Sequence, residues 1–109
     1  MDFNEYQEKA SSTALYPGEK TILGVSYCAL GLAGEAGEYA NKVKKVIRGD
    51  ASLSEATELL VEELGDVLWY LSESAKNLGY SLEDIAALNI GKLAGRRERG
   101  TVRGSGDVR

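Results

Sequence analysis

The sequence contains no histidine and a single cysteine, Cys28, among its 109 residues. Zinc sites are built mainly from histidine and cysteine, and classical catalytic triads use histidine as the base. The sequence therefore lacks the material for a conventional zinc site or a histidine-based triad, and a lone cysteine cannot form an internal disulfide. Any chemistry must rest on carboxylates, lysine, arginine, hydroxyls or a hard metal ion.

Long apolar runs are missing as well. No stretch approaches the roughly 20 apolar residues that span a bilayer, and the acidic N-terminus lacks the basic and then apolar order of a signal peptide. We therefore expect a cytoplasmic protein without a membrane partner. A composition of 43% apolar and 28% charged residues fits one domain with a modest core.

Charge is unevenly distributed along the chain. Residues 1–91 contain 7 Lys or Arg against 15 Asp or Glu, whereas residues 92–109 contain 6 against 2. An acidic body would repel a nucleic acid, so we expect no nucleic-acid partner and favour a small phosphate-bearing ligand for the basic end.

Proline occurs once, at Pro17, and no convincing run of alternating β-branched residues is present. Helical spacing of apolar residues and the capping residues around them predict four helices, over about residues 2–14, 20–48, 52–79 and 81–99. Ser52 with Glu55 is typical of a capping box, and Gly49 of a helix C-cap. Gly95 puts the continuity of the last helix in question. Residues 1–99 are thus predicted to form one domain, followed by a basic, glycine-rich tail over 100–109, for which disorder is favoured.

Short connections between long helices favour antiparallel neighbours, so the predicted fold is an all-α, four-helix bundle-like domain. The stripe of Leu60, Leu64, Val67, Leu71, Ala75 and Leu78 is expected to form its core. A chain this short would leave part of the apolar surface of its two long helices bare. We therefore expect a homodimer or a homotetramer built as a dimer of dimers.

Two pairs of carboxylates lie beside the apolar stripes of the two long helices. The stretch GLAGEAGEYA (31–40) contains Glu35 and Glu38, and the next helix contains Glu63 and Asp66. Residues three apart share one side of a helix, so each pair points together. Four facing carboxylates repel one another, and a divalent cation removes that repulsion. An all-oxygen ligand set selects Mg²⁺, with Mn²⁺ as a substitute, and Mg²⁺ commonly binds together with substrate phosphates.

The glycines and the remaining acids have simpler interpretations. Gly31, Gly34 and Gly37 lower helix stability, which is reasonable if they leave room for metal and phosphate or let another helix approach; tight packing is an equal alternative for Gly31. The other acids of the third helix are expected on a solvated face, namely Glu55, Glu58 and Glu73. Glu62 is either a solvent-exposed neighbour or a further ligand.

The motifs GEAGE (34–38) and EELGDVLWYL (62–71) resemble the MazG-like all-α nucleoside triphosphate pyrophosphohydrolases. The opening FNEYQEKA and the tail RGSGD also look like small stand-alone phage or bacterial members. This resemblance implies Mg²⁺-dependent cleavage of a nucleoside triphosphate between its α and β phosphates, which releases the monophosphate and pyrophosphate and serves nucleotide-pool house-cleaning. It also implies that Glu35, Glu38, Glu63 and Asp66 are the metal ligands and catalytic acids, with Glu35 or Glu38 accepting a proton from the attacking water.

Further substrate contacts follow from spacing and from the same resemblance. Tyr70 falls one turn beyond Asp66, so its hydroxyl is within reach of a phosphate or sugar, although core packing is the competing interpretation. The resemblance assigns a polar and basic set to the last helix: Asn89, Lys92, Arg96 and Arg97. Lys92 and one of the two arginines would bind the leaving pyrophosphate. The "GSGD" residues of the tail could fold over a phosphate.

Several alternatives stay open at this point. The related dimeric dUTPases and phosphoribosyl-ATP pyrophosphohydrolases use similar acidic helices on other substrates. A non-catalytic sensor or interaction module that binds metal and nucleotide, or a purely structural helical oligomer, is also compatible with the sequence. The pocket that selects the base is not located, and its candidates are Tyr6, Gln7, Thr13 and Trp69, with core packing the favoured role for Trp69.

Overall fold

The computed structural model describes residues 1–109 and contains four helices and no strand. These are α1 (Phe3–Ser11), α2 (Ile22–Arg48), α3 (Leu53–Asn77) and α4 (Leu82–Arg99). The predicted all-α class with four helices is therefore confirmed. None of these helices combines the length and the apolar character that crossing a membrane requires.

The ends of the helices follow the capping signals of the sequence. The Ser52 hydroxyl accepts a hydrogen bond from the Glu55 backbone N–H at 3.1 Å, and the Glu55 carboxylate accepts one from the Ser52 N–H at 3.1 Å. Ser81 and Asp84 form the same reciprocal pair at the start of α4. Gly49 ends α2 with a φ of 92°, a left-handed conformation that favours glycine.

Two helices end earlier than predicted, and the continuity of α4 is settled. Helix α1 ends at Ser11, because the hydroxyls of Ser12 and Thr13 turn back and donate to the Lys9 and Ala10 carbonyls. Helix α3 ends at Asn77, two residues before Gly79. Helix α4 continues through Gly95, so a single glycine lowers helix propensity without breaking the helix.

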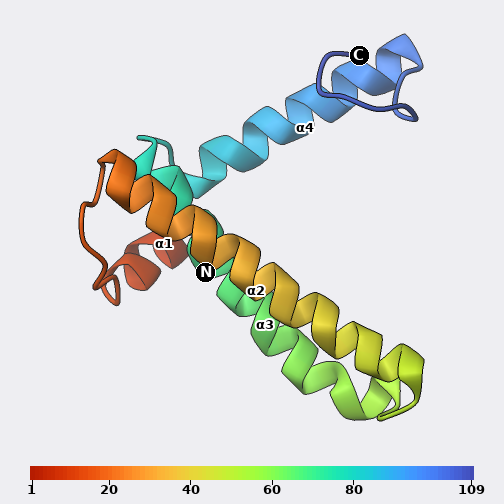
Figure 1. The fold of residues 1–109 in the computed structure, drawn as a ribbon. Coiled ribbons are helices and arrows are strands. Elements are labelled where there is room, and N and C mark those ends of the chain that lie inside the picture. Colours follow the sequence, from red (N-terminus) through yellow and green to blue (C-terminus); the bar gives the residue numbers. More distant parts are fainter.

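The helices form two arms that diverge from a common base (Figure 1). Helices α2 and α3 pack as an antiparallel pair along most of their length, α1 lies against α3 and α4, and α4 leads away without touching α2. The radius of gyration is 16.5 Å, whereas about 13 Å is typical of a compact domain of this length. The four helices therefore do not close into a complete bundle within one chain.

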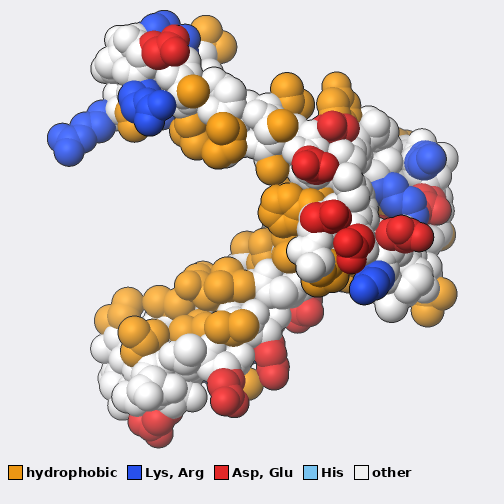
Figure 2. Space-filling view, turned by 180° about the vertical axis from the view of Figure 1, so that it is seen from behind, with side chains coloured by type: hydrophobic (Ala, Val, Ile, Leu, Met, Phe, Trp, Pro, Cys, Tyr) orange, Lys and Arg blue, Asp and Glu red, His pale blue; other side chains and the backbone are white.

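Few apolar side chains are fully enclosed. Only 11 of the 109 residues are buried, and of the predicted core stripe Leu60 and Ala75 are buried while Leu64 and Leu78 are 49% and 62% exposed. Apolar side chains instead gather along both sides of the hollow between the two arms (Figure 2). The stripe prediction is thus only partly correct for the isolated chain, because α2 is the main packing partner of α3, and α1 and α4 contact it far less.

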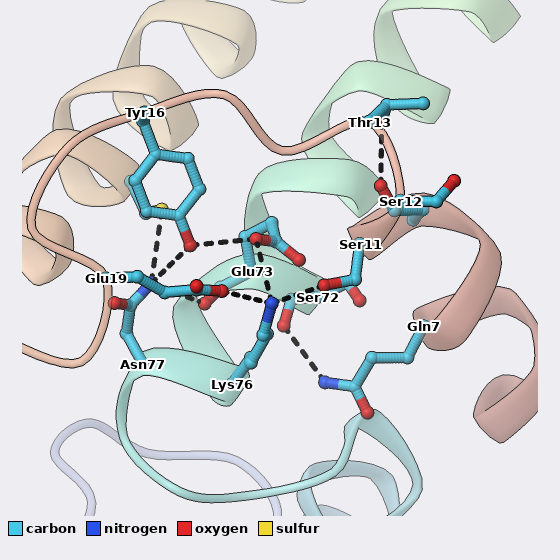
Figure 3. Close-up of polar contacts among 12 residues, drawn as sticks. Gln7, Ser11, Ser12, Thr13, Tyr16, Glu19, Ser72, Glu73, Lys76 and Asn77 are labelled. Carbon is cyan, nitrogen blue, oxygen red and sulfur yellow. Dashed lines mark hydrogen bonds and ion pairs between the residues drawn. The ribbon is translucent and has the colours of Figure 1, made fainter.

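A polar network under residues 12–21 corrects another prediction. Glu73, expected on a solvated face, is 0% exposed. It accepts a hydrogen bond from the Tyr16 hydroxyl at 2.8 Å, and Lys76 Nζ lies 4.0 Å from the same carboxylate oxygen (Figure 3). Asn77 donates to the Tyr16 hydroxyl at 2.8 Å and accepts from the Lys20 backbone N–H at 2.6 Å. These contacts attach the segment after α1 to the end of α3, and they cover Glu73.

Candidate functional site

Three of the four predicted acids meet between α2 and α3. Glu35 from α2 and Glu63 and Asp66 from α3 each offer a carboxylate oxygen, and these oxygens lie within 4.8 Å of one another. Glu35 and Glu63 are half-buried and Asp66 is exposed. Glu38 lies one turn further along α2, exposed, and does not belong to this group. The antiparallel packing of two long helices is what brings the two acidic segments to the same level.

The surroundings drive the pKa values of the two glutamates in opposite directions. Burial, the nearby Glu63 and the charges of Asp66 and Glu38 raise the pKa of Glu35. An ion pair between Lys42 Nζ and Glu63 Oε1 lowers the pKa of Glu63. The second oxygen of Glu63, Oε2, is buried without a hydrogen-bond partner. The cluster thus lacks a compensating positive charge beside Glu35, and it lacks a hydrogen-bond donor for Glu63 Oε2.

These features fit a hard divalent cation. The donor set consists of carboxylate oxygens alone, which suits Mg²⁺ or Mn²⁺ better than soft metals. A cation would offset the repulsion that raises the pKa of Glu35, and it would provide the buried Glu63 oxygen with a partner. The residues present could therefore hold a divalent metal ion.

Lys42 is a member of the site that sequence reasoning missed. Its pKa is raised, mainly by the hydrogen bond to Glu63 and also by the charges of Glu38 and Glu62. Lys42 follows Glu38 by four residues and Glu35 by seven, so all three share one face of α2. A search for basic residues on the helical face that carries Glu35 and Glu38 would have found Lys42 in the sequence.

An open pocket of about 340 Å³ adjoins the acidic cluster, and its lining residues are Thr13, Glu35, Asp66, Trp69 and Tyr70. The Trp69 indole N–H donates to the Thr13 hydroxyl at 3.0 Å, and the rings of Trp69 and Tyr70 meet edge to face with centroids 5.0 Å apart. Tyr70 therefore lies beside Asp66, as its spacing predicted. Two carboxylates of the acidic cluster and two aromatic rings share one pocket.

The other two candidates for base selection lie elsewhere. Gln7 bridges α3 and α4, because its side chain donates to the Ser72 carbonyl at 3.1 Å and accepts from the Leu82 N–H at 3.1 Å. Tyr6 lines a different pocket near the N-terminus. Burial, and after it the charge of Asp66, raises the pKa of Tyr6, so this tyrosine nevertheless lies near that carboxylate. Of the four candidates, only Thr13 and Trp69 line the pocket that contains Glu35 and Asp66.

The three glycines of α2 have different surroundings. A Cβ atom on Gly31 would lie 2.1 Å from Cε1 of the Tyr70 ring, whereas Gly34 and Gly37 have no neighbouring atom within 4 Å of that position. Gly31 therefore makes room for an aromatic wall of the pocket, which supports the packing alternative. Gly34 and Gly37 leave an open strip on α2 beside Glu35 and Glu38.

Comparison with known proteins agrees with this geometry. Residues 25–101 match the MazG nucleotide pyrophosphohydrolase domain. The chain belongs to the MazG family. It is also 45% identical over 114 residues to the "Gene 37 protein" of Mycobacterium phage L5, and the match covers 100% of both chains. No solved structure matches this MazG-family protein. The resemblance read from GEAGE and EELGDVLWYL is confirmed, and it assigns the chain to a family of nucleotide pyrophosphohydrolases.

The polar and basic set of the MazG-family protein lies on α4, away from the acids. None of Asn89, Lys92, Arg96 and Arg97 lines the pocket that holds Glu35 and Asp66, and α4 points away from the α2–α3 pair (Figure 1). The two arginines, which the sequence left undecided, differ in burial: Arg96 is 6% exposed and Arg97 is exposed. The tail is not free of structure, because residues 106 and 107 contact Arg96 and Lys92. A single chain thus presents two separate sets of candidate residues.

Proposed function

We propose that this protein is a Mg²⁺-dependent nucleoside triphosphate pyrophosphohydrolase that cleaves an NTP or dNTP between the α and β phosphates. The products are the nucleoside monophosphate and pyrophosphate, and the role is house-cleaning of the nucleotide pool. One observation carries the proposal: Glu35 and Asp66 belong both to the three-carboxylate cluster and to the pocket walled by Trp69 and Tyr70. A nucleoside triphosphate has the matching parts, with phosphates for a cation and a base for aromatic rings.

The roles of the residues follow from their environments. Glu35, Glu63 and Asp66 would hold the cation, which when bound neutralises phosphate oxygens and makes a water molecule more acidic. Glu35 or Glu38 would accept the proton of that water, because Glu63 is already paired with Lys42. Trp69 and Tyr70 would orient the nucleoside. Glu38, exposed one turn away on the same face, would reach a second ion or the phosphates.

The second part of the proposal is that two copies assemble. The chain exposes 7611 Å², whereas a compact monomer of 11.7 kDa exposes about 5,900 Å². The excess of about 1,700 Å² per chain corresponds to about 3,400 Å² for a pair, within the range of obligate homodimers. The apolar sides of the hollow between the arms are the surface that a second copy would cover (Figure 2). The helices that form the arms expose large apolar side chains such as Leu30, Leu64 and Leu88.

Assembly would also bring together the two sets of candidate residues. Because α4 leads away from the acids of its own chain, Lys92 and Arg96 would bind the phosphates of a nucleotide held by the second copy. A cation placed where negative charge develops on the leaving pyrophosphate stabilises the transition state. This role requires at least a homodimer. It is also compatible with a homotetramer made of two such dimers.

Product determination tests the proposed activity. The purified protein is incubated with canonical and modified NTPs and dNTPs, with and without Mg²⁺, beside Asp66→Ala and the matched surface variant Glu58→Ala. We expect monophosphate and pyrophosphate only with Mg²⁺ and with Asp66 intact, and full activity in Glu58→Ala. Nucleotide binding without turnover across the panel would favour the sensor alternative. Selective cleavage of dUTP or phosphoribosyl-ATP would favour the specificity of those relatives.

A further inference from the structure

The C-terminal tail presents a carboxylate to the two cations assigned above to the phosphates. Asp107 Oδ1 lies 3.1 Å from Lys92 Nζ and 3.4 Å from Arg96 Nη2. Arg96 Nη2 also donates to the backbone carbonyls of Asp107 at 3.0 Å and Gly106 at 3.5 Å. The tail lies over the guanidinium, whose residue is only 6% exposed. A phosphate group can therefore reach Arg96 only if residues 106 and 107 move.

The tail uses only part of the donor capacity of this site. Asp107 contacts both cations through the same oxygen, Oδ1. The Arg96 side chain is only 7% exposed, and its buried Nε has no hydrogen-bond partner. A lysine ammonium and an arginine guanidinium together present eight N–H donors, more than one carboxylate oxygen and the two backbone carbonyls of residues 106 and 107 can satisfy. A ligand with several anionic oxygens, such as a phosphate or pyrophosphate, suits these donors better.

We propose that Asp107 is an internal competitor for phosphate: it occupies the Lys92–Arg96 site until a polyphosphate displaces it, so the tail acts as a reversible cover. This inference rests on the proposed function for the assignment of Lys92 and Arg96 to phosphates, and it adds a regulatory contact to that site.

The properties of Asp107 match a displaceable occupant. Its side chain is 84% exposed, and ion pairs as exposed as this are weak and screened by salt. Lys92, followed by Arg96, lowers its pKa, so the group carries its negative charge throughout the neutral range. Two anions cannot share the site without repulsion, and the more highly charged pyrophosphate has the stronger attraction.

The tail also has attachments that do not involve Asp107. The Arg109 guanidinium donates to the carbonyls of Thr101 at 3.0 Å and Val102 at 3.2 Å, and Arg99 Nε donates to the Arg109 carbonyl at 3.2 Å. These bonds keep the tail close to α4 when Asp107 leaves. The carboxylate can therefore return quickly once the anion departs.

The test is the binding of inorganic pyrophosphate to the full-length protein, measured by titration calorimetry without nucleotide. The variants are Asp107→Asn and Asp107→Glu. The control is Glu98→Gln, which removes a carboxylate of α4 that contacts neither Lys92 nor Arg96. We expect Asp107→Asn to bind pyrophosphate about fivefold more tightly than the wild type, the size of one weak ion pair. Asp107→Glu and Glu98→Gln should bind like the wild type.

Two results would overturn the inference. Weaker binding by Asp107→Asn would mean that Asp107 positions the two cations for the ligand. Equal affinity in the wild type and Asp107→Asn, including no detectable binding by either, would mean that the carboxylate does not compete. Because the readout needs no turnover, tighter binding by Asp107→Asn in a protein that hydrolyses no nucleotide would leave this inference standing while the proposed activity fails.

Discussion

Substituting Gly31 by alanine tests how the pocket is built. The added Cβ atom would lie 2.1, 2.4 and 2.5 Å from three atoms of the Tyr70 ring, which no real contact tolerates. The ring has little freedom to retreat, because its edge-to-face contact with Trp69 has a centroid distance of 5.0 Å. Forcing an extra methyl group into such a contact destabilises proteins by about 1–3 kcal/mol.

A matched control separates this clash from helix propensity. Replacing a helical glycine by alanine stabilises a helix by about 1 kcal/mol when space is available. Gly91 in α4 has no atom within 4 Å of its Cβ position, so Gly91→Ala receives that benefit alone. Gly31→Ala should therefore be less stable than Gly91→Ala by about 1–3 kcal/mol.

The assay is urea unfolding at one fixed protein concentration, since association would make the apparent stability concentration-dependent. Gly31→Ala should also raise KM for the nucleotide, because Tyr70 lines the pocket beside Asp66. If Gly31→Ala proved as stable as Gly91→Ala, the packing of the Tyr70 ring against α2 would be refuted.

Three further outcomes are expected. Glu73→Ala should lose about 1–3 kcal/mol in urea unfolding, because it removes the acceptor of the Tyr16 hydroxyl while Lys76 keeps its ion pair with Glu19, and the exposed control Glu58→Ala should change little. Without metal, the raised pKa of Glu35 means that the folded protein prefers the protonated form. Relative to a Glu35→Gln variant, the wild type should lose thermal stability as pH rises from 4.5 through that raised pKa, and Mg²⁺ should reverse the loss; a pH series of melting temperatures of both proteins with and without Mg²⁺ checks this. Cys28 is buried and burial raises its pKa, so a thiol reagent should react with it only in denaturant, as followed by absorbance.

Local signals predicted much of this fold. The capping pair Ser52–Glu55 and the glycine cap at Gly49 are interactions over three or four residues, and they form as the sequence indicates. The meeting of Glu35 with Glu63 and Asp66 was also predictable, because it requires only two adjacent antiparallel helices with acids at matching heights.

Long-range contacts were beyond the same reasoning. Glu73 has the spacing of a surface residue, and only the folding of residues 12–21 onto α3 places Tyr16 over it. Likewise, the apolar period of α3 predicts a core at Leu64 and Leu78 but not which molecule covers them. The contact between Asp107 and Lys92 depends on a turn at the end of α4, where composition alone favours disorder.

The most direct test of the central claim is Mn²⁺ binding followed by electron paramagnetic resonance in the wild type, Asp66→Asn and Glu58→Gln. The claim is that Glu35, Glu63 and Asp66 together hold a divalent cation. It predicts equal Mn²⁺ affinity in the wild type and Glu58→Gln, and an affinity at least about tenfold lower in Asp66→Asn. Unchanged affinity in Asp66→Asn would contradict the metal centre and, with it, the proposed mechanism.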